Sequence, residues 1–142
     1  MANLKHLDIL QCGVEVWNAW RQDNPRALPD LSGVDLTGAQ LPRANLSGAK
    51  LRRSTLTRAF LPGADLNGAD LYQVEFYRAN LTASDMRRCD LSGAKFHNAD
   101  LTDANLNESD LFRVDFINTE LTGTQFARAR CALTTFAGVA SL

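Results

Sequence analysis

A five-residue pattern of small, polar and large apolar positions runs from Pro29 to Gly138 without an insertion. In the unit from Ala64 to Gly68, for example, a small residue, an acidic residue and a leucine precede two variable positions. Taking the large residue as the centre of each unit gives 22 centres, which are fifteen Leu, five Phe, one Met and one Cys. A period of five fits neither an amphipathic helix nor a long alternating strand, so the pattern predicts a repeat architecture.

The positions within each unit predict the path of the chain. The residue two places before the centre is small, and it is Ala in eleven of the 22 units. Residues two apart lie on the same side of an extended backbone, so this residue and the centre should both point inward. The other positions must turn, and all eight glycines of the repeats fall two places after the centre. Seven Arg occupy this same column, so we expect that positive φ is not required there.

A longer period sets the number of units in one coil. Phenylalanines recur every twenty residues, at Phe76, Phe96, Phe116 and Phe136, and three valines fall on the same quarter. Side chains that stack from coil to coil favour neighbours of similar shape, so the simplest interpretation is four units in each coil. The repeats then predict an all-β solenoid, square in section, with about 5.5 coils.

The segment before the repeats has a helical pattern instead. Asn3 is a suitable N-cap, and one apolar stripe follows at helical spacing, formed by Leu7, Leu10, Val14 and Trp17. A solenoid exposes leucines and unpaired strand edges at its first coil, and a helix with one apolar face can cover them. We therefore predict a single capping helix, with Trp17 and Trp20 packed against the end of the solenoid.

The repeats resemble the pentapeptide-repeat family, whose motif A-(D/N)-L-x-x is matched across about three quarters of the chain. The resemblance implies a right-handed quadrilateral β-helix with very short strands joined by turns. The segment from Gly13 to Arg21, with the prolines that follow it, also resembles the N-terminal cap of many small bacterial members. The expected domains are a capping helix and linker at 1–28, a β-helix at 29–138 and a C-terminal tail at 139–142.

Composition and cysteine usage favour a cytoplasmic protein. The net charge is −1, and charged residues interrupt the only apolar run of the first 28 residues, so neither a signal peptide nor a membrane span is expected. Three cysteines at spacings unlike a metal site or a redox pair favour a reducing compartment. Cys89 and Cys131 fall in inward columns about two coils, roughly 10 Å, apart, so we predict two inert core thiols rather than a disulfide.

The pattern offers no chemistry for an enzyme. A coil filled by Leu, Phe and Ala leaves no pocket, and His6 and His97 lie far apart. The hydroxyl side chains in the small inward column should bond to backbone, and these are Ser54, Ser84, Ser109, Thr119, Thr124 and Thr134. We expect no catalytic, cofactor or metal site, and no nucleic-acid binding, because neighbouring carboxylates dilute the arginines.

Two non-enzymatic functions remain open. Some family members, of the quinolone-resistance type, resemble a rod of DNA and bind DNA gyrase in its place, which requires a strongly negative surface. The face of Leu31 carries five positive and four negative charges. The next three faces carry three positive and three negative, one positive and three negative, and three positive and three negative charges. No face is strongly acidic, so a DNA-mimicking regulator is the second hypothesis.

The first hypothesis is a protein-protein interaction or scaffold module. Residues directly after the centres include Tyr72 and Phe112 on one face, and Tyr77, His97 and Ile117 on the next. Aromatic residues are enriched where partners dock, so these five residues, edged by arginines, are the predicted protein-binding site. The alternative is that they are scattered surface side chains packed on arginine stems.

The C-terminal end lacks a capping helix in the sequence. Residues 132–142 carry no charge, and Leu133 occupies a turn column that elsewhere is Gly, Arg or polar. Such an apolar end requires a cover, either the tail folded back over the last coil or a second molecule docked end to end about a two-fold axis. The tail is short, so the sequence favours a homodimer that buries Leu133 and Phe136.

Overall fold

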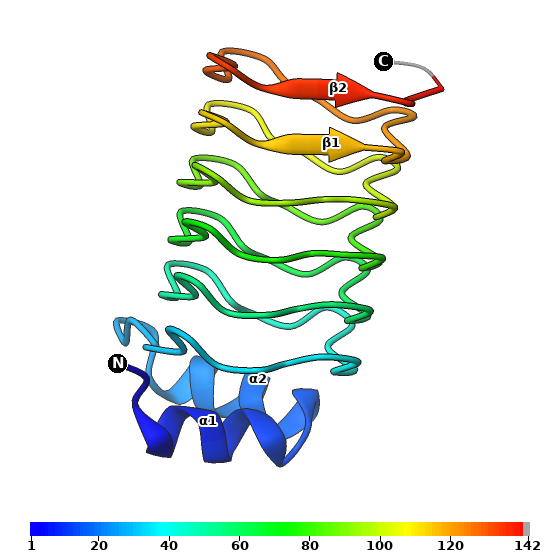
Figure 1. Cartoon of the computed structure of the whole chain (residues 1–142). Coiled ribbons are helices and arrows are strands. Elements are labelled where there is room, and N and C mark those ends of the chain that lie inside the picture. Colours follow the sequence, from blue (N-terminus) through cyan, green and yellow to red (C-terminus); the bar gives the residue numbers. More distant parts are fainter. Residues whose placement is uncertain (141–142) are drawn as a thin grey trace.

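The computed structural model describes residues 1–140 as a stack of coils with two helices at its N-terminal end (Figure 1). The helices are α1 (Leu4–Gln11) and α2 (Val14–Asp23), and two short strands, β1 (Asp115–Ile117) and β2 (Thr135–Ala137), pair in parallel near the other end. Elsewhere in the stack, isolated parallel bridges join each outward residue to the residue twenty positions later, from Asp30 with Lys50 to Asp110 with Arg130. The twenty-residue period predicted from the phenylalanines is present, and the handedness of the coil stays a prediction.

An inner five-residue unit donates three backbone hydrogen bonds to the neighbouring coils. In the unit centred on Leu51, the N–H of the centre donates to the carbonyl of Asp70 at 2.8 Å, and the N–H of Arg53 donates to the carbonyl of Tyr72 at 2.8 Å. In the other direction, the N–H of Lys50 donates to the carbonyl of Pro29 at 2.8 Å. Each coil therefore depends on the coil on either side for its backbone partners.

The turns correct one expectation about glycine. Every residue two places after a centre has positive φ, whether it is one of eight glycines or one of fourteen other residues, including seven arginines with φ of 56–58°. A left-handed conformation costs an L-residue about 1–2 kcal/mol. The residue's N–H donates to the next coil in return, as Arg53 does to Tyr72. The coil geometry therefore requires positive φ at this position, and Arg adopts it although its side chain makes that conformation less favourable than it is for glycine.

The acidic column has a structural task. At Asp30, Asp65 and Asp70, one carboxylate oxygen accepts a hydrogen bond from the backbone N–H two residues later, at 3.0–3.2 Å. Asparagine oxygens do the same at Asn80 and Asn105, at 3.0 Å. The side chain replaces a backbone acceptor at each turn, which explains why Asp and Asn alternate freely in this column.

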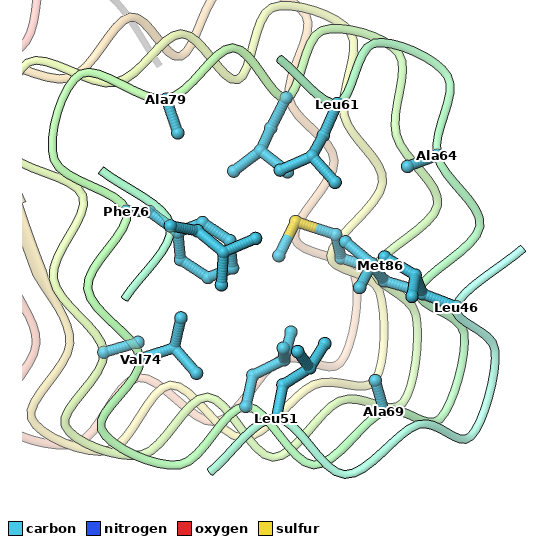
Figure 2. Close-up of a cluster of buried hydrophobic side chains, with 14 of the residues drawn as sticks. Leu46, Leu51, Leu61, Ala64, Ala69, Val74, Phe76, Ala79 and Met86 are labelled. Atoms are coloured by element: carbon cyan, nitrogen blue, oxygen red, sulfur yellow. The ribbon is translucent and has the colours of Figure 1, made fainter. Parts of the chain in front are cut away.

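The interior is filled by the centre and small columns, as predicted. Figure 2 shows Leu51, Leu61, Phe76 and Met86 pointing into the interior from the four sides of the coil. The phenylalanines form a stacked column with ring centroids 4.9–5.2 Å apart, made of Phe76, Phe96, Phe116 and Phe136. Five of the six inward hydroxyls donate to a backbone carbonyl, whereas Ser84 Oγ is buried without a partner among residues 1–140.

The predicted single capping helix is in fact two helices. Asn3 caps α1 as expected, since its side chain accepts a hydrogen bond from the N–H of Lys5 at 3.0 Å. Gly13 then adopts φ 112° and ψ 160°, which no helix contains, and α2 begins at the next residue. Leu10 of α1 and Trp17 of α2 are still both buried against the first coil, so the apolar stripe was predicted correctly while its continuity was not.

Side chains of α2 replace the missing coil below the first one. The indole N–H of Trp17 donates to the carbonyl of Asn45 at 2.8 Å, and the side-chain oxygen of Asn18 accepts from the N–H of Asn45 at 2.8 Å. The guanidinium of Arg21 donates to the carbonyl of Ser47 at 2.8 Å. In the stack, the carbonyls of these two columns accept from backbone N–H groups of the coil below. Burial lowers the pKa of Arg21, and the negative charge of Asp65 opposes part of that shift.

Candidate functional site

The five residues of the predicted protein-binding site lie on two neighbouring corners of the coil, and together they are called the outer strip. The first corner carries Tyr72 and Phe112, and the next carries Tyr77, His97 and Ile117. Phe112 has 39% of its surface exposed, and the other four are half-buried. The structure thus places all five side chains at turn positions on the outside of the stack.

On the second corner, Tyr77 and His97 are in contact across adjacent coils. Their ring centroids lie 5.1 Å apart in an edge-to-face arrangement, and Nε2 of His97 lies 3.7 Å from a carboxylate oxygen of Asp115. That distance is too long for a hydrogen bond, and Nε2 is buried without one among residues 1–140. The corner therefore presents an aromatic pair with an unused polar atom beside it.

On the first corner, arginines lie over the aromatic rings. The guanidinium carbon of Arg52 is 4.7 Å from the centroid of Tyr72, that of Arg53 is 5.7 Å from it, and that of Arg113 is 5.0 Å from the centroid of Phe112. These contacts match the packing on arginine stems that the sequence left as an alternative. They also create flat cationic and aromatic surfaces of the kind found at binding interfaces.

Sequence reasoning missed a third apolar surface. Phe60 is 37% exposed and lines a groove between the stack and α2, together with Val14, Pro42 and Pro62. The signal was present, because Phe60 is the one aromatic residue in the column directly before the centres, which otherwise is polar or charged. The groove adds apolar surface on the side of the rod nearest the cap.

The last coil is open. Phe136 is 37% exposed, whereas the corresponding centres of the inner coils, such as Phe96 and Phe116, are buried, and Leu133 in its turn column is 68% exposed. Among residues 1–140, the backbone N–H groups of the four last centres have no partner in a following coil, and these are Leu121, Phe126, Cys131 and Phe136. In the predicted tail, Val139 packs on the core and Ala140 is exposed, whereas Ser141 and Leu142 lie outside the described residues.

The open end also corrects the prediction for one cysteine. Cys131 is exposed, because it belongs to the final coil and no further coil covers it. Cys89, by contrast, is buried as predicted, and burial raises the pKa of its thiol to about 12. All three cysteines are free.

Arginines pair with part of the surface carboxylates. Four pairs join an arginine to a neighbouring acid at 2.6–3.8 Å, and these are Arg52–Asp70, Arg87–Asp85, Arg88–Glu108 and Arg130–Asp110. The hydrogen bond from Arg87 holds the pKa of Asp85 below its ordinary value. Within residues 1–140, no three His, Cys, Asp or Glu side chains are grouped to hold a metal, and no helix is long and apolar enough to cross a membrane.

Comparisons with known proteins agree with this geometry. A family model described as a pentapeptide repeat region matches residues 49–126. No curated protein matches the chain. A pentapeptide repeat protein, Rfr23 from the cyanobacterium Cyanothece 51142, is 26% identical, with a TM-score of 0.61 over 86% of this chain and 91% of that one.

Two further solved structures are more distant in shape. A pentapeptide repeat protein from the Arabidopsis thaliana thylakoid lumen is 30% identical, with a TM-score of 0.30 over 70% of this chain and 59% of that one. QnrB1, a plasmid-mediated fluoroquinolone resistance protein, is 17% identical, with a TM-score of 0.46 over 80% of this chain and 70% of that one. The family model covers more than half of the sequence, and the chain belongs to the pentapeptide-repeat family.

Proposed function

We propose that this chain is a non-enzymatic protein-binding module whose outer strip contacts another protein. The observation that carries the proposal is the row of aromatic rings along two adjacent corners, which pack against arginines on the first corner and form the Tyr77–His97 pair on the second. Tyr and Arg are among the side chains that contribute most at protein interfaces, and Phe is enriched there. Most other turn positions of the rod carry small or polar residues, so the strip differs from the surface around it.

The geometry of the strip suits a partner with an extended, acidic segment. Arg52 lies over Tyr72 and pairs with Asp70, whereas Arg53 and Arg113 lie over the rings without an ion pair among residues 1–140 and can pair with a partner's carboxylates. On the second corner the rings of Tyr77 and His97 supply the contact area, because Nε2 of His97 is buried beside Asp115. The corners follow the long axis of the rod, so a segment lying along them contacts successive coils.

DNA mimicry, the second hypothesis from the sequence, finds less support in the surface. A DNA-like partner surface needs unpaired negative charge along a face, whereas here many carboxylates accept hydrogen bonds from turn N–H groups or pair with arginines. We therefore expect the purified protein to leave DNA supercoiling by gyrase unchanged at micromolar concentration.

The test of the strip compares two matched double variants. Tyr77→Ala with Ile117→Glu alters the second corner, and Asn67→Ala with Asn107→Glu alters half-buried residues of the same column on the opposite corner. In a cross-linking pull-down with full-length protein as bait, we expect the strip variant to lose capture of specific partners about tenfold or more, and the control variant to keep it. Equal capture by all three folded proteins would exclude the strip as the interface.

Localisation, handedness and self-association belong to the same proposal. We place the protein in the bacterial cytoplasm, which suits three free thiols. We propose that the rod is a right-handed coil of about 5.5 turns, as the repeats and the family resemblance predict. We also propose that two copies associate end to end through Leu133 and Phe136, since both are exposed on the open coil.

A further inference from the structure

The cap pairs with two of the four sides of the first coil. On one side, the N–H of Asp30 donates to His6 at 3.1 Å, and its carbonyl accepts from the N–H of Asn3 at 2.8 Å. On another side, the N–H and the carbonyl of Asn45 bond to side chains of α2, at 2.8 Å each. In the inner coils, the same two groups of each outward residue pair with the coil below. On these two sides the cap therefore takes the place of a coil.

The other two sides of the first coil keep these backbone groups unpaired. Their outward residues, Asp35 and Gln40, are exposed. Among residues 1–140, neither the N–H nor the carbonyl of either residue has a hydrogen-bond partner. Both groups of each residue face the junction with the cap, as they face the coil below in the rest of the stack. An N–H and a carbonyl of one residue that face the same way are the groups through which a strand edge pairs with an extended chain.

Two apolar hollows lie one after the other along this junction. The first, of about 620 Å³, lies between Leu4 and Leu7 of α1 and Val34 of the first coil. The second, of about 330 Å³, lies between Leu10 of α1 and Leu36. Val34 and Leu36 keep 8% and 6% of their surface exposed, more than any other buried apolar residue in the described part of the chain. The cap therefore covers the core least completely on the sides where the strand edge is unpaired.

The hollows lie where an added strand places its inward side chains. Val34 and Leu36 flank Asp35 in the sequence, and each lines one of the two hollows. In a segment that pairs with Asp35, the residues before and after the paired residue point to the same side as Val34 and Leu36. Their side chains enter the hollows, whereas the paired residue points outward beside Asp35.

Asp35 also supplies a charge on this edge. Its carboxylate forms no ion pair within residues 1–140, and the residue bridged to it in the coil above is the neutral Thr55. Hydrogen bonds from Thr37 hold the pKa of Asp35 below its ordinary value, so the carboxylate is ionised at neutral pH. Opposite charges on directly paired residues stabilise a sheet, so a basic residue is favoured opposite Asp35.

We propose that this uncovered edge binds an extended segment of another protein in which a lysine or arginine lies between two apolar residues. The backbone of the segment pairs with the N–H and carbonyl of Asp35, and its basic side chain faces the Asp35 carboxylate. The two apolar side chains fill the hollows beside α1. The site is separate from the outer strip, and the experiments below do not depend on the pull-down that tests the proposed function.

Peptide titration followed by NMR tests the site in the full-length protein. The probe is Ser-Val-Lys-Leu-Ser with blocked ends, and its amide contacts should move the Asp35 amide proton downfield, with a dissociation constant of about 1 mM or lower. The amide of Asp30 is already bonded to His6, so its unchanged signal is the internal control. The peptide Ser-Ser-Lys-Ser-Ser lacks the apolar pair and should bind at least about tenfold more weakly.

Two protein variants and a charge-reversed peptide, Ser-Val-Glu-Leu-Ser, test the ion pair. The original protein should prefer the lysine peptide, and Asp35→Lys should prefer the glutamate peptide, each by about fivefold or more. Asp100→Lys is the matched control and should keep the original preference, because Asp100 accepts the same turn hydrogen bonds as Asp35 but lies in an inner coil. Lysine occupies the outward column at Lys50 and Lys95, so both variants should fold.

Three results would overturn the proposal. One is an Asp35 amide that does not move at lysine-peptide concentrations up to about 5 mM. Another is equal binding of the lysine and glutamate peptides to the original protein. The third is an Asp35 amide that shifts with protein concentration when no peptide is present, since the edge then pairs with a second copy of this chain.

Discussion

At the helical end of the rod, side chains of α1 and α2 occupy the hydrogen-bonding groups on two sides of the first coil, whereas the last coil ends with its backbone groups and Leu133 exposed. The sides of the two coils are built from the same five-residue units. The difference between the ends therefore lies in the segments that flank the repeats. A stack of identical repeats is capped only where a segment of different sequence follows or precedes it.

The capped end shows how a helix can terminate a β-solenoid. Trp17, Asn18 and Arg21 lie within five residues of each other on α2, and each one supplies a donor or acceptor that a lower coil would supply from its backbone. The N–H of Asp30 is served in the same way by Nδ1 of His6, at 3.1 Å. The cap therefore satisfies strand edges as well as covering leucines, which distinguishes it from simple apolar packing.

Removal of residues 1–24 is the change with the largest expected effect. It uncovers four large centres of the first coil, Leu31, Leu36, Leu41 and Leu46, each worth about 1.5–3 kcal/mol of burial. That total is comparable with the net stability of a small domain, so the truncated rod should aggregate. Size-exclusion chromatography with thermal melting checks this, and a monomeric rod with an unchanged melting temperature would show that the helices are not a cap.

Trp17→Ala is expected to come next in size. The side chain is completely buried, so truncation should lower the free energy of unfolding by about 3–5 kcal/mol, measured by denaturant titration. Trp17→Phe is the control that keeps most of the ring and removes the indole N–H. This variant leaves the Asn45 carbonyl unpaired, so it should lower the free energy of unfolding by about 1–3 kcal/mol. An unchanged free energy of unfolding would mean that the hydrogen bond contributes nothing to stability.

A pair of alanine variants compares the same column at the two ends. Leu31 is fully buried beneath the cap, so Leu31→Ala should lower the free energy of unfolding by about 2–5 kcal/mol. Phe136 is 37% exposed, so Phe136→Ala should cost less than Leu31→Ala when unfolding is measured at nanomolar concentration, where the proposed dimer is dissociated. Equal costs would indicate that the open end is packed as tightly as the capped one.

Acid should lower the stability of the two ends by similar amounts, and this is the smallest of the expected effects. Hydrogen bonds from Thr37 and Thr122 hold the pKa values of Asp35 and Glu120 below their ordinary values of 3.8 and 4.5. The stability they add is fully present above those ordinary values and is lost as pH falls through the lowered ones. Asp35→Asn and Glu120→Gln should each make the melting temperature slightly less sensitive to pH between about 5 and 2. If both variants keep the pH dependence of the original protein, these turn hydrogen bonds do not contribute to its stability in acid.

Much of the stack could be predicted because the repeat makes each residue's surroundings the same in every coil. The phenylalanine column, the inward hydroxyls and the buried leucines all follow from spacing. Positive φ at Arg43 or Arg53 could not be deduced from residue type, because the cross-coil hydrogen bond that offsets it is a tertiary contact. Cys131 was misplaced for a related reason, since its column is buried only where another coil follows.

The cap was harder to predict than the stack. Gly13 was a visible helix breaker, but the apolar stripe that continues past it favoured a single helix. The hydrogen bonds that Asn18 and Arg21 form with the first coil join residues that are 25–27 positions apart, and nothing in the pattern predicts such pairs. The outer strip was found from its column, whereas its contacts with arginines depend on side-chain conformations that spacing does not determine.

The bridged positions are always twenty residues apart, so the length of the rod changes in steps of one coil. Since each coil contacts only its neighbours, loss or duplication of one twenty-residue block leaves every face in its original orientation. The distance from the cap to the strip then changes by one strand spacing, about 4.8 Å, with no rotation around the axis. Such a molecule can vary in reach during evolution without redesign of either end.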